Sequence, residues 1–247
     1  MEILGIDVGG TGIKAAIVNV ETGELSADRK RIPTPRPATP DAIANVIKKL
    51  VKHFHWEGSV GCGFPALLKN GICLSGGNLH EDWKGINVGE LFKNTAGNKF
   101  TVVNDADAAG IAEMNFGAGK DKNGVVIMIT LGTGIGSAVF LDGKLLPNTE
   151  FGHLLNRHGE SFEIYAADSA RKREKLSQKK WGKRLHKYFS HLNFIMSPDL
   201  IIIGGGASKR VHKFIHKIEI DTPIAPAQAE NDAGIIGAAM AAKFNNK

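Results

Sequence analysis

Apolar residues near the start of the chain follow a strand pattern that glycines interrupt. Residues 2–8 form an apolar run with β-branched side chains, and the run ends at Gly9. A run of this length bounded by glycine predicts a buried strand. Further strands are expected at residues 13–20, 59–64, 100–103, 125–130 and 200–203.

Apolar residues at helical spacing predict at least three helices. Ile43, Val46, Ile47 and Leu50 indicate a helix that Asp41 is expected to cap, after a proline-rich loop at 32–40. The helical pattern returns from Ala106 to about residue 117, and again over the small residues 233–244. The last helix has side chains small enough to pack closely against a sheet.

A short pattern recurs 122 residues along the chain. Thr11-Gly12-Ile13 reappears as Thr133-Gly134-Ile135, and Gly10 and Ala16 match Gly132 and Ala138 at the same offset. Each copy consists of a strand, a glycine turn and a second strand. The repeat predicts two related lobes with a cleft between them.

Composition narrows the class of protein. The chain has 247 residues, of which 43% are hydrophobic, and no run reaches the roughly 18 apolar residues of a membrane span. No signal-peptide pattern precedes the first strand, and two cysteines are too few for a disulfide scaffold. A cytoplasmic location without membrane association is expected.

Positive charge is concentrated in one segment. The formal net charge is +6, and residues 171–187 carry nine Lys or Arg against one Glu. Such a run is usually a solvated helix face, although clustered cations also attract polyanions. No nucleic-acid-binding motif accompanies the charge, so a nucleic-acid partner is not expected.

The glycine turns suit phosphate binding. Glycines let backbone N–H groups turn toward an anion and approach it closely. Asp7 directly precedes the first turn, where a carboxylate makes sense if it holds Mg²⁺, directly or through water. Neither turn is a Walker loop or a dinucleotide fingerprint, because a strand follows each and no Gly-Lys-Ser/Thr occurs.

Two polar motifs are candidates for the remaining chemistry. Asn104 and Asp105 lie between a strand and a helix, where a carboxylate serves equally well as a general base or as a helix cap. Glu150 and His153 flank a glycine and suit recognition of sugar hydroxyls. Zinc is not expected there, because only His158 and no cysteine lies nearby.

These motifs together resemble the ROK family of sugar kinases and repressors over essentially the whole chain. The resemblance rests on DVGGTGIK (7–14), GFP (63–65), NDADAA (104–109), LGTGIG (131–136), EFGH (150–153) and IIIGGG (201–206). Within the family, segments 76–87, 159–170, 181–209 and 230–242 are most similar to the polyphosphate glucokinases.

The resemblance implies an α/β protein with an actin-like ATPase (ribonuclease H-like) fold. It implies an N-terminal lobe of residues 1–105, with the helix at about 233–247 packed back on it, and a C-terminal lobe of residues 106–232. Members of the family are usually homodimers. The implied reaction is phosphoryl transfer to the 6-hydroxyl of glucose.

The resemblance also assigns roles to individual residues. Asp105 matches the catalytic base, which takes a proton from the sugar. The implied sugar-binding residues are Asn78, Asn104, Asp105, Glu150, His153 and Glu163. The implied donor-binding residues are Asp7, Gly9, Gly10, Thr11, Gly12, Lys14, Gly132, Thr133, Gly134, Gly136, Gly204, Gly205 and Gly206.

The chain departs from many family members in lacking a cysteine-rich zinc segment after the Glu-x-Gly-His motif. Glu163 is the candidate for the sugar-binding glutamate that ends that segment in relatives. A family repressor would need an added DNA-binding domain, which is not expected before Met1.

The phosphoryl donor is the main open question at this level. Inorganic polyphosphate is favoured over ATP by resemblance, and both are compatible with one enzyme. Lys179, Lys180, Lys183 and Arg184 are the expected cationic track for a long polyphosphate chain. The alternatives are a strictly ATP-dependent kinase, a kinase of another hexose and a non-catalytic sugar-sensing protein.

Overall fold

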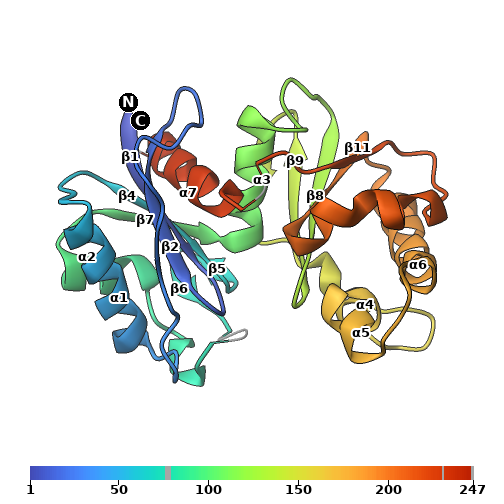
Figure 1. Ribbon diagram of the computed structural model, residues 1–247, viewed down its shortest axis with the longest axis horizontal. Coiled ribbons are helices and arrows are strands. Elements are labelled where there is room, and N and C mark those ends of the chain that lie inside the picture. The colour runs from blue at the N-terminus through green and yellow to red at the C-terminus, as the bar shows by residue number, and fades with distance from the viewer. Residues whose placement is uncertain (76–78, 230, 246–247) are drawn as a thin grey trace. The chain divides into compact units, whose positions relative to one another are not determined.

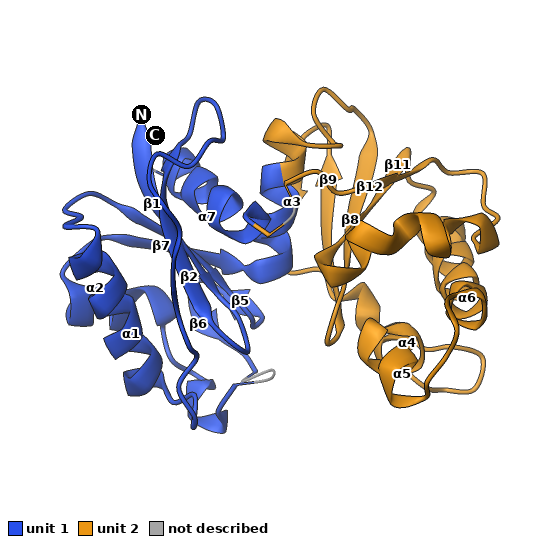
Figure 2. Cartoon of the chain, viewed as in Figure 1, with its two compact units in different colours: residues 1–112, 232–247 blue, residues 113–231 orange. Residues whose placement is uncertain are grey.

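The computed structural model describes residues 1–75, 79–229 and 231–245, which fold into two compact units (Figure 2). Unit 1 comprises Met1–Ala112 together with Asp232–Lys247, and unit 2 comprises Glu113–Asn231. The C-terminal segment therefore folds with the N-terminal one.

Unit 1 is built on a five-stranded sheet with the order β3-β2-β1-β4-β7. Its strands are β1 (Glu2–Val8), β2 (Ile13–Asn19), β3 (Lys30–Ile32), β4 (Val60–Phe64) and β7 (Phe100–Asn104). β1 pairs antiparallel with β2 in a tight hairpin, and β1, β4 and β7 run parallel. The carboxyl ends of these three strands therefore meet at one edge of the sheet.

One face of this sheet is covered by large apolar side chains. Leu4 and Ile6 of β1 are fully buried in a cluster with Ile43, Ile47 and Leu50 of the helix α1 (Pro40–His53). The helix α2 (Val88–Ala96) packs beside α1 (Figure 1). Full burial of each such side chain contributes about 1.5–3 kcal/mol, so this face supplies much of the stability of unit 1.

The other face of the sheet carries glycines where the helix α7 (Ala233–Phe244) lies on it (Figure 1). A Cβ on Gly5 would lie 2.1 Å from the carbonyl oxygen of Ile235, and one on Gly61 would lie 1.8 Å from that of Ala238. The close packing expected of this small-residue helix is confirmed.

The start of α1 differs from the sequence-based expectation. Thr39 rather than Asp41 is the N-cap, because its hydroxyl accepts a hydrogen bond from the backbone N–H of Ala42 at 3.4 Å. Pro40 is the first helical residue, where its missing N–H costs nothing. Asp41 lies in the first turn, where its negative charge interacts favourably with the helix dipole.

The rest of unit 1 includes a short hairpin and a single helical turn. The strands β5 (Leu68–Lys69) and β6 (Ile72–Cys73) form a short hairpin, and η1 (Glu81–Trp83) is a single turn. Trp83 is fully buried against Phe64 and Phe92, and its indole N–H donates to the carbonyl of Ala38 at 2.9 Å. Cys62 and Cys73 are both buried thiols without a disulfide, as expected.

Unit 2 repeats the design of unit 1. Its sheet has the order β10-β9-β8-β11-β12, the same succession of antiparallel hairpin and parallel strands. Its strands are β8 (Val125–Leu131), β9 (Ile135–Leu141), β10 (Lys144–Leu146), β11 (Leu200–Gly204) and β12 (Ile224–Pro226). The shared order agrees with the internal repeat in the sequence and with an actin-like α/β fold.

Helices of unit 2 pack on one face of this sheet. They are α4 (Phe162–Ala166), α5 (Asp168–Arg173), α6 (Gln178–Met196) and the 3-10 segments η2 (Phe151–His153), η3 (Gly205–Lys213) and η4 (Ile215–Lys217). Trp181, Leu185 and Phe189 of α6 are fully buried with Ile201 and Ile203 of β11. α3 (Asp105–Phe116) carries the chain from unit 1 into unit 2.

No helix in the part of the chain that the structure describes is long and apolar enough to span a membrane.

Candidate functional site

The first glycine turn, residues 9–12, joins β1 to β2 and is held by three contacts. The N–H of Gly9 donates to the carbonyl of Gly12 at 3.2 Å. The hydroxyl of Thr34 donates to the carbonyl of Gly9, and the guanidinium of Arg31 donates to that of Thr11 at 2.7 Å. These bonds occupy carbonyl groups, so the turn is fixed without using the hydroxyl of Thr11.

Asp7 lies directly before this turn and pairs with Lys14. The two residues face each other across the β1–β2 hairpin, and the ammonium of Lys14 is 3.2 Å from the carboxylate. The carboxyl group also packs on the start of α7, where a Cβ on Gly234 would lie 2.8 Å from its carbon.

The surroundings of Asp7 fit Mg²⁺. Mg²⁺ commonly takes one or two carboxylate ligands and completes its shell with waters and phosphate oxygens. Asp7 offers one partly exposed carboxylate beside a phosphate-type turn. Asp7 is therefore the residue of unit 1 that would hold the ion, with Lys14 as a second positive charge.

The end of β7 presents Asn104 and Asp105 at the same edge of the sheet as Asp7. Asp7 is paired with Gly63 of β4, which is paired with Val103 of β7. The amide oxygen of Asn104 accepts from the N–H of Ala106 at 2.8 Å and from that of Asp107 at 3.2 Å. Asn104 therefore caps α3, while Asp105 beside it is exposed.

Asn104 and Asp105 differ in burial, and both accept a hydrogen bond from the N–H of Ala106. Asn104 is 7% exposed, and its amide N–H₂ donates to the carbonyl of Ala66 at 3.3 Å, so it holds the strand–helix junction. Asp107 is buried in the first turn of α3. Asp105, in contrast, is exposed, so its carboxylate is accessible to a substrate.

The second glycine turn, residues 132–134, joins β8 to β9 and is held by side chains from α4 and α5. Glu163 accepts from the N–H of Ile135 at 2.8 Å. Ser169 donates to the carbonyl of Thr133 at 2.6 Å through its hydroxyl, and to that of Gly132 at 3.1 Å through its N–H. Glu163, expected only as a sugar ligand, thus also fixes the turn.

Glu150 and His153 lie beside this turn. Gly152 between them packs directly on β9, because a Cβ there would lie 2.3 Å from the carbonyl oxygen of Ile135. His153 Nε2 is 3.8 Å from the carboxylate of Glu150. Burial raises the pKa of Glu150; nearby His153 lowers that pKa, and the charge of Glu163 raises it further. Three of the expected sugar-binding residues are therefore brought together in unit 2.

The third glycine turn, residues 204–206, lies at the same edge of the unit 2 sheet as the second. Gly204 pairs with Thr130, and Gly205 packs so closely on Leu131 that a Cβ would lie 2.8 Å from its carbonyl oxygen. Gly205 also has φ +71°, a conformation that favours glycine.

One glycine in each turn leaves open space beside its backbone, as far as the described residues show. A Cβ built on Gly10, Gly132 or Gly206 meets nothing within 4 Å. Most of the other glycines in the two sheets are packed against neighbours. The open positions are where an anion could approach the backbone closely.

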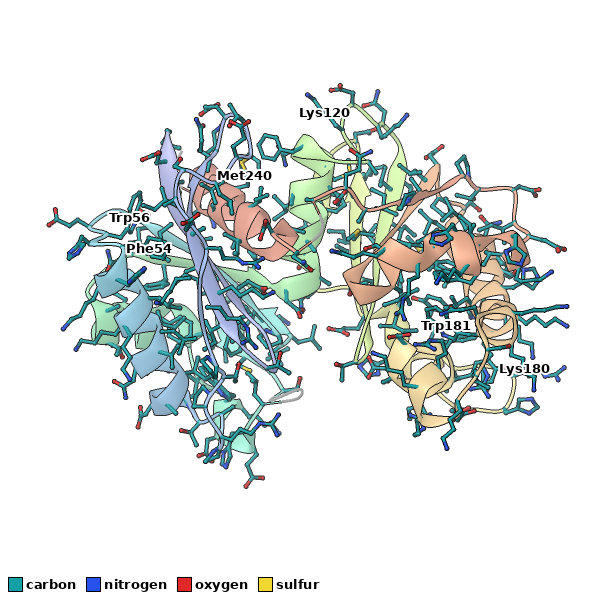
Figure 3. The ribbon with its side chains drawn as sticks, viewed as in Figure 1. Phe54, Trp56, Lys120, Lys180, Trp181 and Met240 are labelled. Atoms are coloured by element: carbon teal, nitrogen blue, oxygen red, sulfur yellow. The ribbon has the colours of Figure 1, made fainter. Side chains whose placement is uncertain are left out.

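The cations expected to form the polyphosphate track fall into two groups, exposed lysines and an arginine held in contacts within the protein. Lys179, Lys180 and Lys183 are exposed on α6, and Figure 3 shows Lys180 and the buried Trp181 as neighbours on that helix. Arg184 differs, because its guanidinium pairs with Glu174, donates to the carbonyl of Tyr165 at 2.8 Å and lies 4.6 Å from the Tyr165 ring.

Several contacts of the site were not anticipated from the sequence. Thr34, Arg31 and Ser169 support the two glycine turns, and Asp168 binds three cations next to Ser169. Only the position of Arg31 could have been inferred, and only from the pairing of β3 with β2, because that pairing makes Arg31 the cross-strand neighbour of Lys14. Asn78, an expected sugar-binding residue, lies outside the described residues.

Each unit thus carries phosphate-type turns and its own reactive side chains. Unit 1 has the first turn, Asp7 with Lys14, and the exposed Asp105. Unit 2 has the second and third turns with Glu150, His153 and Glu163. Phosphoryl transfer to a hydroxyl needs backbone groups that approach phosphate closely, a carboxylate able to act as a base and polar groups for the substrate, and residues of these types occur at these positions.

Known proteins resemble the chain over nearly its whole length. It is 43% identical over 238 residues to the polyphosphate glucokinase of Mycobacterium tuberculosis (strain CDC 1551 / Oshkosh), a match covering 96% of this chain and 89% of that protein. It is 42% identical to the inorganic polyphosphate/ATP-glucomannokinase from Arthrobacter sp. strain KM, with a TM-score of 0.94 and 99% of each chain covered.

More distant structures share the fold. The ROK family glucokinase from Streptomyces griseus superposes with a TM-score of 0.83 at 23% identity, covering 99% of this chain and 100% of that one. The ROK family model matches residues 3–161, which include the first two glycine turns, Asp105 and the Glu-x-Gly-His motif. The chain belongs to the ROK family.

Proposed function

We propose that this chain phosphorylates glucose at its 6-hydroxyl with inorganic polyphosphate as the donor, and that it also accepts ATP. One observation carries the assignment to a kinase. Asp105 is an exposed carboxylate on a rigid strand–helix junction, at the sheet edge where Asp7 and the first glycine turn lie. The similarity to polyphosphate-using kinases from Mycobacterium and Arthrobacter supports the donor.

In the proposed reaction, Asp105 accepts the proton of the 6-hydroxyl as the sugar oxygen attacks the terminal phosphorus of the donor. The P–O bond to the rest of the donor breaks, which leaves a shortened polyphosphate or ADP and gives glucose 6-phosphate. The protein contributes mainly positioning and charge neutralisation. The glycine turns would supply backbone N–H groups to the donor, and Lys14 adds a positive charge.

Sugar recognition falls to Glu150, His153 and Glu163, with Asn104 and Asn78 as further ligands implied by the family. A carboxylate accepts two hydroxyl hydrogen bonds at once, and an imidazole either donates or accepts one. Polar ligands that a bound sugar covers discriminate strongly against sugars that lack the matching hydroxyl.

Mg²⁺ and a second subunit complete the proposal. Mg²⁺ held near Asp7 would neutralise donor phosphates, which is its usual part in phosphoryl transfer. Lys179, Lys180 and Lys183 on α6 would attract the outer part of a long polyphosphate. A homodimer, typical of the family, would give twice the 26.5 kDa mass of the chain in light scattering.

A panel of sugars tests the proposed function. With polyphosphate and Mg²⁺, product analysis should give glucose 6-phosphate, and mannose should also react if the chain shares the specificity that the name of the Arthrobacter enzyme indicates. Phosphorylation of only an N-acetyl sugar or fructose would replace glucose as the substrate. No phosphorylation of any sugar, together with measurable glucose binding, would favour a sugar-sensing protein.

A further inference from the structure

Asp168 is a buried carboxylate that three cations surround. Its side chain is 3% exposed, and it lies 2.7 Å from the guanidinium of Arg171, 2.9 Å from the ammonium of Lys172 and 3.2 Å from the guanidinium of Arg210. We call these four residues the Asp168 cluster. Arg171 and Lys172 follow on the same helix, whereas Arg210 comes from η3, 42 residues further along the chain.

The cluster is attached to two of the glycine turns of unit 2. Asp168 immediately precedes Ser169, which donates two hydrogen bonds to the second turn. Arg210 belongs to η3, which begins at Gly205 of the third turn. The cluster is therefore connected through Ser169 to the second turn and through the start of η3 to the third turn, and these turns contain the open glycines Gly132 and Gly206.

The cluster carries more positive charge than its own carboxylate neutralises. Burial alone would raise the pKa of Asp168, but hydrogen bonds from Lys172 and Arg171 outweigh it and hold that pKa below its usual range. Asp168 is thus ionised at neutral pH, and one negative charge faces three positive ones. Glu174, the acidic residue next along the chain, is paired with Arg173 and Arg184.

The cations are fixed in place yet accessible. The side chains of Lys172 and Arg210 are 66% and 30% exposed, and the guanidinium of Arg171 lies 5.7 Å from the ring of Trp181. Asp168 already orders these long side chains. Binding of an anion to them therefore costs less conformational entropy than binding to mobile side chains would. Cations oriented in this way favour phosphate over a neutral ligand.

We propose that Arg171, Lys172 and Arg210, positioned by Asp168, bind phosphate groups of a long polyphosphate donor beyond its third unit, counted from the one that is transferred. The inference rests on the proposed function and extends it to donor choice. A linear polyphosphate carries a negative charge on every unit, whereas ATP places an uncharged ribose and base beyond its third phosphate. The cluster would therefore favour polyphosphate over ATP.

A double variant tests this subsite, with Lys172→Met and Arg210→Met and with Arg171 left to pair with Asp168. The KM for long-chain polyphosphate should rise about tenfold, as expected for two partly exposed charge-assisted contacts. The KM for ATP should change less than threefold, and that for glucose should not change. Tripolyphosphate should show a smaller loss than the long chain.

The matched control is Lys122→Met with Lys144→Met, which removes the same charge from exposed positions of unit 2. Both residues lie at the end of the β8–β9 hairpin away from the second turn, ~20 Å along a strand of seven residues. The control should leave the KM for polyphosphate within about twofold of wild type. An equal loss in the control would reduce the effect to general charge and overturn the subsite.

Other outcomes separate the subsite from the proposed function. An unchanged KM for polyphosphate in the double variant, or an equal rise for ATP, would overturn the subsite while leaving the kinase intact. If the double variant does not fold, Lys172→Met alone is decisive, because that side chain is largely exposed. If wild type phosphorylates no sugar, the proposed function fails, and a polyphosphate-induced rise in Tm that the variant loses would still support the subsite.

Discussion

At the scale of single residues, the neighbours Asn104 and Asp105 differ in exposure: Asn104 is buried, whereas Asp105 is exposed. The N–H of Ala106 donates to the amide oxygen of Asn104 at 2.8 Å and to the carboxylate of Asp105 at 2.9 Å, and Asn104 also accepts from the N–H of Asp107. An asparagine at position 105 keeps an oxygen that can accept the same hydrogen bond, so Asp105→Asn is expected to preserve the fold.

Asp105→Asn should therefore lower kcat by about 10²–10⁴-fold, the usual contribution of a general base, and leave the glucose affinity nearly unchanged. The measurement is steady-state kinetics together with glucose binding by calorimetry. Asp28→Asn, which removes the same charge from an exposed loop position of unit 1, is the control. Turnover of Asp105→Asn within a few-fold of wild type would refute its role as base.

Glu150 gives a prediction about pH. Its pKa is raised by burial and by Glu163 and lowered by His153, so ionised Glu150 is lost at a higher pH than for an ordinary glutamate. If the carboxylate binds sugar, the KM for glucose should increase as the pH falls through this raised pKa.

Two variants should move that acid limb in opposite directions. Glu163→Gln removes a negative charge but keeps an oxygen for the N–H of Ile135, so the limb should shift to lower pH. His153→Gln removes the neighbour that lowers the pKa, so the limb should shift to higher pH. The same shift in both variants would show that Glu150 does not set the pH dependence.

At the scale of elements, the same residue type serves two purposes. Gly61 lets α7 lie directly on β4, where a Cβ would be 1.8 Å from the carbonyl oxygen of Ala238. Gly132 faces open space at the second glycine turn. The first is needed for packing and the second, on this account, for a ligand.

Gly61→Ala and Gly132→Ala make a matched pair. Gly61→Ala should lower the free energy of unfolding by about 1–3 kcal/mol or more, because α7 must move away from the sheet. Gly132→Ala should leave that free energy nearly unchanged and raise the KM for the donor. Denaturant unfolding and donor kinetics measure the two effects. Equal destabilisation of both variants would contradict the assignment of Gly132 to ligand binding.

The elements also show where sequence patterns suffice. Long apolar strands, the glycine turns and α7 were predictable, because apolar runs and glycines can be recognised within a few consecutive residues. The edge strands β3, β10 and β12 were not, since each has three residues and only partial burial. The cap of α1 was misplaced by two residues, because Thr39 and Asp41 are both good capping residues and only the structure shows which hydroxyl or carboxylate accepts the bond.

At the scale of the whole molecule, the repeat in the sequence corresponds to two sheets with the same strand order. The family motifs supplied most of the candidate site residues, because each motif lies within a few residues of a strand end. The contact of Glu163 with the second turn and that of Arg210 with Asp168 were not predictable, because they join residues 28 and 42 positions apart. Such contacts depend on the packing of α4, α5 and η3, which no local pattern specifies.

The choice of donor is the property of the whole molecule that the account most depends on. The direct measurement is kcat/KM for glucose phosphorylation with long-chain polyphosphate and with ATP, in one preparation, with Mg²⁺ and at matched phosphate concentration. The account predicts a higher kcat/KM with polyphosphate and a lower, measurable value with ATP. Activity with ATP alone would contradict it.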